Sequence, residues 1–378
     1  NIQLIHLVFS GLGMYLLLEQ FKMDRLISFS VGLLWILNPY LITMIVFGHG
    51  SQMMTAAYIP WLLYGVNRLK NSISIESLAL LSLLIGLQLQ RGHVQIAYYS
   101  CMLVGAYFLY SFIMKKQNKN KYLLYFIISC GLGFLLASHI YYPSLDYLDN
   151  SIRSGGNNHY QYATNWSMHP KELLTYLFPY YYGFGGSSYS GYMPFTDYPN
   201  YVGFFVIFSA LFSFIKLNVQ KAFFVIILAL SILLSFGKYF DVLYEFFYSF
   251  FPYFSNFRVP SMILIISNFT LYILAAFGLK DIIVSILNID RFKNFESKII
   301  ISIFLLFSII DIYRINKNII SPSDESAQKS QIISTEKFNS FFEEDEAIKF
   351  LKNESELYRV YPVGELFQDP KLKFHGIQ

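Results

Sequence analysis

Ten apolar stretches run through this chain, and they limit its fold more than any other feature. They are residues 2–18, 26–47, 53–67, 75–90, 94–114, 122–140, 201–215, 222–236, 259–279 and 298–312. A helix needs about 20 apolar residues to cross the hydrocarbon core of a bilayer, and several stretches approach that length. Of the 378 residues 55% are hydrophobic and 14% are charged, which leaves too little polar surface for a soluble chain. The sequence therefore predicts an all-α polytopic membrane protein with about ten transmembrane helices.

The second stretch is interrupted by Asn38-Pro39. Proline has no N–H and frees a backbone carbonyl in the preceding turn. Inside a membrane that carbonyl must find a donor on a neighbouring helix or from water. We therefore expect a kinked or broken helix here, facing a cavity.

The connections between stretches alternate between rich and poor in lysine and arginine. The rich connections hold Lys22, Arg25, Arg68, Lys70, Lys115, Lys116, Lys119, Lys121, Lys216, Lys221, Lys280, Arg291, Lys293 and Lys298. The poor connections hold Arg91, Arg153, Lys171, Lys238 and Arg258. Because basic loops stay in the cytoplasm, the poor connections are predicted to be extracytoplasmic. Most of the net charge of +4 comes from residues that orient the helices, so the charge indicates no nucleic-acid partner.

Two regions are predicted from this topology. Residues 1–312 form a transmembrane domain with a long extracytoplasmic loop, 141–200. Residues 313–378 change in character and include the acidic run Glu343-Glu344-Asp345-Glu346. They predict the start of an extracytoplasmic α/β soluble domain, with a helix near 342–353 and a strand near 358–363.

Two histidines stand beside glycines at predicted extracytoplasmic turns. His49 lies in Gly-His-Gly, and His93 lies between Arg91 and Gln95. A histidine at the membrane edge is often only a hydrogen-bonded structural residue. Two on one face, one of them beside an arginine, also suit proton acceptance or hydrogen bonding to a phosphate. Their spacing differs from a helical His-x-x-x-His zinc pair, so no metal site is predicted.

Loop 141–200 is long, rich in tyrosine and glycine, and too aromatic to be disordered. Aromatic faces suit sugar rings, although an aromatic belt at the interface explains the tyrosines equally well. Arg153 stands beside two glycines, which suits a bound phosphate. Arg258 is a second candidate phosphate clamp, or else an arginine snorkelling to the interface.

Within the loop, Trp166-Ser167-Met168-His169-Pro170-Lys171-Glu172 predicts a turn that enters a helix. Pro170 fits the first helical turn, Glu172 favours it, and the helix N-terminus can hold an anion. A capped interfacial helix without ligand is the alternative. The extracytoplasmic carboxylates Asp146, Asp149, Asp197, Asp241 and Glu245 are not distinguished from one another by any spacing.

These clusters, in this order, resemble the bacterial YfhO family of polytopic membrane proteins. The matching stretches are Gly48-His49, Ile59-Pro60-Trp61, Gly92 to Tyr99, Ser151-Ile152-Arg153, Tyr162 to Ser167, Pro170 to Leu174, Pro179 with Gly183, and Phe257 to Pro260. The resemblance covers nearly the whole chain and implies a fold like that of the GT-C glycosyltransferase superfamily. It also implies a fragment, with an N-terminal helix, a first loop that carries the catalytic acid, and a C-terminal part expected outside it.

The implied function is transfer of a sugar from a polyprenyl-phosphate carrier to a cell-surface polymer or glycolipid, at the extracytoplasmic face of the bacterial cytoplasmic membrane. His49 and His93 would support catalysis. Substrate would be bound by Arg91, Gln95, Arg153, Trp166, His169, Lys171, Glu172 and Arg258. No cofactor is firmly implied, and a role for a divalent cation stays open. The alternatives are a transporter or flippase for a lipid-linked or anionic substrate, and a non-catalytic cell-envelope assembly subunit.

Overall fold

The computed structural model describes residues 2–147, 159–289, 296–322 and 334–353, together with residues 360, 371, 374 and 375. The chain divides into two compact units, Asn1–Gln328 and Lys329–Gln378. The described residues form helices and turns without a β-strand. The last helix of the first unit continues through residue 313, where the sequence places a boundary, to Ile320.

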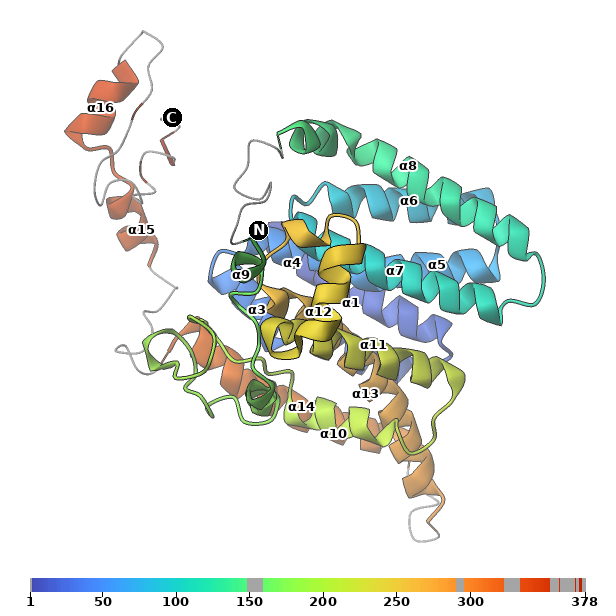
Figure 1. Ribbon diagram of the computed structural model, residues 1–378. Helices are drawn as coiled ribbons and strands as arrows, with labels where there is room; N and C mark the ends of the chain where they lie inside the picture. The colour runs from blue at the N-terminus through green and yellow to red at the C-terminus, as the bar shows by residue number, and fades with distance from the viewer. Residues whose placement is uncertain are drawn as a thin grey trace. The chain divides into compact units, whose positions relative to one another are not determined.

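The first unit is a bundle of helices (Figure 1). Its α-helices are α1 Ile2–Gln20, α2 Arg25–Ile36, α3 Pro39–Val46, α4 Gly50–Ala56, α5 Ile59–Asn71, α6 Ile75–Leu89, α7 Val94–Met114, α8 Lys119–Asp146, α9 His159–Ala163, α10 Phe204–Phe212, α11 Val219–Ser235, α12 Asp241–Phe250, α13 Leu264–Leu287 and α14 Ser297–Ile320. Short 3-10 helices are η2 Pro170–Tyr176, η3 Gly186–Ser188, η4 Gly237–Phe240, η5 Phe254–Asn256 and η6 Pro260–Ile263.

Six helical stretches of the described chain are long and apolar enough to cross a membrane. They are Ile2–Gln20, Arg25–Val46, Val94–Met114, Lys119–Ser144, Pro260–Leu287 and Ser297–Ile320. A seventh is obtained if Val219–Ser235 and Gly237–Phe250, bent by 115° at their junction, count as one span. Each of the ten predicted stretches contains helix, but α5, α6 and α10 have only 13, 15 and 9 residues. At 1.5 Å per residue these three are shorter than a core of about 30 Å.

The predicted break at Asn38-Pro39 separates α2 from α3. The Asn38 side chain caps α3 by accepting from the N–H of Tyr40 at 3.0 Å. The break frees the Leu37 carbonyl oxygen, and Asn316 of α14 donates its side-chain N–H to it at 2.8 Å. A neighbouring helix therefore satisfies a carbonyl that the break leaves without a helical donor.

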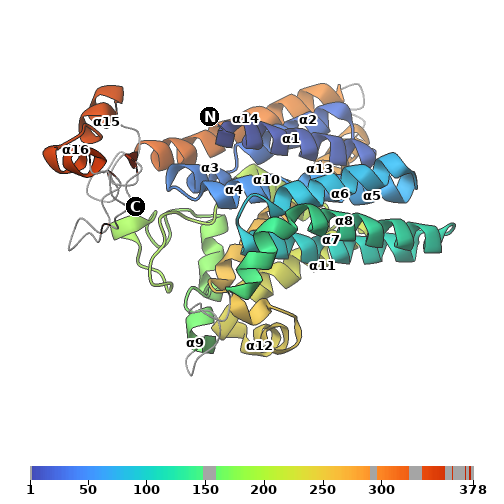
Figure 2. The same ribbon diagram turned by 90° about the horizontal axis from the view of Figure 1, so that it is seen from above.

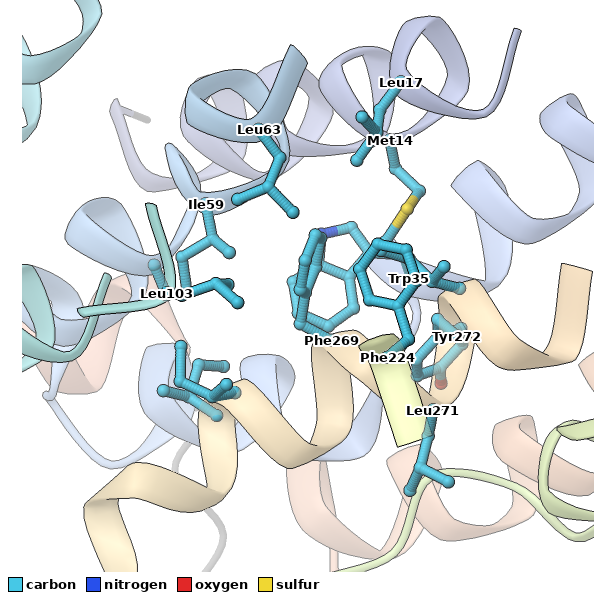
Figure 3. Packing of buried hydrophobic residues seen from close by; sticks show 14 of the residues in the cluster. Met14, Leu17, Trp35, Ile59, Leu63, Leu103, Phe224, Phe269, Leu271 and Tyr272 are labelled. Atoms are coloured by element: carbon cyan, nitrogen blue, oxygen red, sulfur yellow. The ribbon is translucent and has the colours of Figure 1, made fainter. Parts of the chain in front are cut away.

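Trp35 of α2 lies at the centre of the bundle core (Figure 3). Its ring packs edge-on against Phe269 and Tyr272 of α13, with centroids 5.7 and 5.5 Å apart. Its indole N–H donates to the Ser10 hydroxyl of α1 at 2.7 Å. Apolar burial drives little association between helices in lipid, so close packing and such internal hydrogen bonds hold the bundle together.

The lysine-rich connections gather at one end of the bundle, here named the cationic end. The Lys115 side chain donates to the Lys70 carbonyl oxygen, which joins the α7–α8 turn to the end of α5. Phe21, just after α1, packs against Phe224 of α11 and Phe277 of α13, at centroid distances of 5.8 and 6.2 Å. The opposite end, where α4, α7 and α13 begin, is named the polar end. In Figure 2 the α7–α8 turn lies at the right and the loop between α9 and α10 at the left.

The second unit contains two described helices, α15 Thr335–Phe341 and α16 Glu346–Asn353. Ser334 and Asp345 accept backbone N–H bonds at the starts of these helices, as capping residues do. The helix predicted near 342–353 is present as α16. The strand predicted near 358–363 lies outside the described residues, apart from Val360. The α/β character expected of this region is thus not shown by its described part, which is helical.

Candidate functional site

A cavity of about 260 Å³ opens at the polar end of the bundle. It is lined by Tyr40, His49, Gln52, Trp166, Met193, Phe195, Thr196, Asp197, Tyr198, Asn200, Arg258, Val259, Ser261 and Met262. These residues come from α3, the start of α4, the long connection between α9 and α10, and η6 with the short link that leads into it. The cavity is named the polar-end cavity below.

Backbone hydrogen bonds dock the loop after α9 onto the bundle and so form one wall of the cavity. The N–H of Met168 donates to the Ser235 carbonyl at the end of α11, at 2.9 Å. The Ser167 hydroxyl accepts from the N–H of Lys238 at 3.1 Å. The N–H of Ser261 approaches the Trp166 carbonyl at 3.4 Å. The Trp-Ser motif therefore joins the loop to both α11 and η6.

Trp166 forms the aromatic part of this wall. Its indole N–H donates to the Phe195 carbonyl at 3.2 Å, and its ring meets the Phe195 ring edge-on at a centroid distance of 5.4 Å. These contacts fix the indole plane while leaving the side chain partly exposed. An oriented aromatic face is the surface on which the C–H side of a sugar ring packs.

Arg258 brings a guanidinium to the cavity and is itself exposed. One guanidinium nitrogen donates to the Tyr162 hydroxyl at 2.7 Å, and the Tyr162 ring lies 5.5 Å from the guanidinium carbon. These contacts orient the cation without neutralising it. Arginine held in this way can still bind a phosphate through its remaining donors.

The side-chain amide of Gln95 holds the backbone at this arginine. Its side-chain N–H donates to the carbonyl oxygen of Arg258, and it also approaches that of Val259 at 3.4 Å and the Tyr99 hydroxyl at 3.0 Å. Val259 has a φ of +60°, a conformation that a β-branched residue rarely adopts. The Gln95 amide thus helps to hold a strained turn at the mouth of the cavity, and strain of this kind concentrates at binding sites.

His49 and Asp197 place an imidazole and a carboxylate on the same cavity. His49 precedes α4 as its N-cap residue, is exposed, and makes no side-chain capping bond there. Asp197 is half-buried, and this burial raises the pKa of its carboxyl above the usual value, while His49 acts in the opposite direction. The pair supplies a proton acceptor beside a second titratable group.

Glu172 has a structural environment that the sequence does not reveal. It lies in η2, is 2% exposed, and accepts from the Tyr189 hydroxyl and from the N–H of Tyr192, the latter at 2.7 Å. Burial and the bond to Glu172 raise the pKa of Tyr189 above its usual value. Glu172 therefore ties the segment 189–193, which supplies Met193 to the cavity, back onto η2.

The remaining predicted residues lie beside the cavity rather than in its lining. His93 caps α7 by accepting from the N–H of Ile96 at 3.2 Å, and Arg91 donates to the Leu87 carbonyl at 3.2 Å. His169 caps η2 by accepting from the N–H of Lys171 at 3.2 Å and stacks on Tyr192. The expected anion site at this helix start is therefore taken by a side chain of the protein itself.

Lys171 and Arg153 complete the set of predicted binding residues. Lys171 is exposed, and its side chain is not part of the cavity lining. Arg153, the first candidate phosphate clamp, lies outside the described residues together with the neighbouring glycines.

Sequence reasoning missed several residues that line the cavity, above all Gln52, Asp197 and Asn200. Asp197 was one of five extracytoplasmic carboxylates, and nothing in its spacing separates it from the others. The one sequence feature that could have pointed to it is the neighbouring pair Tyr198-Pro199 at the end of the loop, an aromatic residue followed by a proline. Within the described parts of the chain, no group of three or more His, Cys, Asp or Glu residues is arranged to hold a metal ion.

The fold and the site together define a helical, membrane-embedded protein with a polar cavity at one end of its bundle. Comparison of the chain with protein-family models, with curated proteins and with solved structures gives no match. The function therefore has to be argued from the residues of the cavity.

Proposed function

We propose that the protein transfers a sugar from a polyprenyl-phosphate carrier to a cell-surface polymer or glycolipid, and that the reaction takes place in the polar-end cavity. The observation that supports this most is that the Arg258 guanidinium and the Trp166 ring line one cavity. They correspond to two needs of such a reaction, which are a phosphate clamp and a sugar platform.

The dimensions of the cavity favour a small headgroup. Its volume of about 260 Å³ is close to the lower end of the range of roughly 300–1,000 Å³ for small-molecule sites. A monosaccharide phosphate suits this space better than an oligosaccharide does. The polyprenyl tail would then lie outside the cavity, along the apolar surface of the helices.

The orientation of the bundle is part of the proposal. Because basic connections stay in the cytoplasm, the cationic end would face the cytoplasm and the polar-end cavity the extracytoplasmic side of a bacterial cytoplasmic membrane. The short helices α5, α6 and α10 would then join the longer ones in a ten-helix, GT-C-like arrangement. Residues 313–378 would begin an extracytoplasmic domain with α/β character.

Replacing Arg258 tests this function directly. Membranes that contain the full chain are incubated with polyprenyl phosphate that carries a radiolabelled hexose, and label in polymer or glycolipid is counted. A hydrogen bond to a charged group contributes about 1.5–3 kcal/mol, so Arg258→Gln should reduce transfer roughly 10- to 150-fold. Lys238→Gln is the matched control, because Lys238 is an exposed cation at the same end whose side chain is not part of the lining. Equal transfer by wild type and Arg258→Gln would argue against the proposal.

A flippase is the second candidate, and one observation favours it. Tyr40, the second residue of α3, lies directly after the break between α2 and α3 and lines the cavity. Broken helices of this kind often form the binding sites of transporters. Reconstitution in liposomes separates the two functions. A flippase moves the lipid-linked sugar between leaflets and leaves its glycosidic bond intact, whereas a transferase consumes it. Binding without either event would indicate the assembly subunit.

A further inference from the structure

Asp197 is distinguished from the other described carboxylates by its position. It lines the polar-end cavity together with His49 and Arg258. Glu172 is buried behind the wall and bound to the segment 189–193. Asp241 is exposed on α12 and is not part of the lining.

Two other carboxylates of the described bundle lie away from the cavity and bind other groups. Asp311 of α14 accepts from the Tyr201 hydroxyl and from the N–H of Phe204, at 2.6 and 2.7 Å. Asp281 pairs with Lys221 at the cationic end. Neither side chain reaches the cavity, so position selects Asp197.

The backbone around Asp197 is held on both sides, as the positioning of a proton acceptor requires. The carbonyl of Thr196 accepts from the N–H of Gly186 at 2.8 Å, and the Thr196 hydroxyl donates to the Tyr198 carbonyl at 2.9 Å. A Cβ at Gly185 would approach the Asp197 carbonyl oxygen to 2.3 Å, so these two backbone segments lie in direct contact. On the other side, the Tyr198 ring meets that of Tyr40 edge-on, at 5.6 Å.

The environment of the carboxyl suits proton transfer. Burial raises the pKa of Asp197 above its usual value, and His49 opposes the shift. The other titratable or charged groups on the cavity are Tyr40, Tyr198 and Arg258. A carboxylate with a raised pKa is a stronger base than an exposed one, and it is still ionised when the pH exceeds that pKa.

We propose that Asp197 is the general base of the reaction in the polar-end cavity, and that the His49 imidazole acts on its carboxylate electrostatically. This inference rests on the proposed function. The acceptor hydroxyl forms a bond to the anomeric carbon while its proton passes to an oxygen of Asp197. The bond between the anomeric carbon and the phosphate oxygen breaks, and polyprenyl phosphate leaves with the electron pair beside Arg258. The GT-C resemblance implies a catalytic acid in a first extracytoplasmic loop, whereas this assignment places it in the loop before α10.

The test compares binding with turnover in Asp197→Asn. The full chain is purified in detergent, and binding of hexosyl polyprenyl phosphate is measured separately from the rate of sugar transfer at saturating donor. Asp197→Asn should bind the donor within about twofold of wild type, whereas its kcat should fall about 10²- to 10⁴-fold, the usual contribution of a general base. Asp241→Asn, an exposed carboxylate at the same end, should keep the wild-type kcat.

The pH profile and chemical rescue add readouts that a purely structural role would not change. The base acts in its ionised form, so wild-type kcat should fall as the pH decreases through the pKa of Asp197, which burial raises above the usual value of an aspartate. The residual kcat of Asp197→Asn should not show this fall at low pH. Formate should restore part of the rate of Asp197→Ala, because it supplies a carboxylate in the vacated space.

The outcomes separate the two proposals. If wild type transfers sugar and Asp197→Asn does so at the same kcat, or if that variant loses donor binding to the same degree as turnover, the assignment of Asp197 is overturned while the proposed function stands. If wild type does not consume the donor, whether or not it binds it, the proposed function is overturned and this inference with it.

Discussion

Single residues of the polar-end cavity depend on partners that are distant in sequence. Arg258 is oriented by Tyr162, 96 residues away, and its carbonyl is bound by Gln95, 163 residues away. The strained Val259 follows it directly, at a φ of +60°. Such a conformation costs about 1–3 kcal/mol and persists only where the surroundings impose it. The chemistry of the arginine thus depends on a glutamine that does not line the cavity.

Replacing Gln95 by leucine should therefore weaken both the fold and the site. The change leaves the carbonyl of Arg258 without its buried donor, which costs about 1–3 kcal/mol. We expect a lower apparent melting temperature in detergent, together with weaker binding of the polyprenyl-phosphate donor because the turn at Val259 loosens.

Gln90→Leu is the control for this change, since the Gln90 amide also donates to a backbone carbonyl, that of Leu136, but between α6 and α8. It should leave donor binding unchanged. Wild-type donor binding by Gln95→Leu would show that the amide does not position Arg258.

At the scale of elements, close approach between helices depends on small residues. Gly278 of α13 faces the backbone of α10, and a Cβ there would come within 1.7 Å of the Ser209 carbonyl oxygen. The Ser209 hydroxyl in turn donates to the Ala275 carbonyl at 2.9 Å. In lipid, where apolar burial contributes little, such contacts carry much of the stability of a helix pair.

Gly278→Ala should therefore destabilise the bundle, because the added methyl forces α10 away from α13. Overpacking of this kind costs about 1–3 kcal/mol or more, which should appear as a lower melting temperature. Gly131→Ala on α8 is the matched control, because a Cβ there meets nothing within 4 Å. This variant should be as stable as wild type or slightly more so, since alanine favours helix by about 1 kcal/mol over glycine. Equal melting temperatures for the two variants would contradict the close α10–α13 packing.

The same scale shows where helix prediction from sequence succeeds and where it stops. The stretch 94–114 agrees with the observed bounds of α7, and the predicted break before Pro39 lies where α3 begins. The prediction of ten spans is not supported to the same degree, because hydropathy alone does not separate a membrane-crossing helix from a short one such as α10. Near Pro170 a helix start was predicted correctly, but the helix is a seven-residue 3-10 segment.

At the scale of the whole molecule, the two ends of the bundle differ in chemistry. The lysines at the ends of α5 and α7 meet at the cationic end, while His49, Trp166 and Arg258 meet at the polar end. This polarity is expected of a protein whose basic loops remain in the cytoplasm.

Cysteine labelling in intact cells tests the orientation. In a background with Cys101 and Cys130 replaced by alanine, single cysteines are placed at the exposed Ser51, at the polar end, and Ser72, after α5. A membrane-impermeant maleimide should label Ser51→Cys directly, and Ser72→Cys only after the cells are permeabilised. The reverse pattern would place the cavity in the cytoplasm and would exclude transfer at the outer face.

The helical, membrane-embedded class, the break at Asn38-Pro39 and three cavity residues, His49, Trp166 and Arg258, can be predicted from the sequence. These predictions follow from local properties, namely the length of apolar runs, the missing N–H of proline and the asymmetry of basic loops. The folded structure is needed to see that Asp197 lines the cavity, that Glu172 is buried and binds the segment 189–193, and that Gln95 holds the Arg258 turn. The physical reason is that burial and hydrogen-bond partners arise from segments that meet in space, and no pattern within one segment records them.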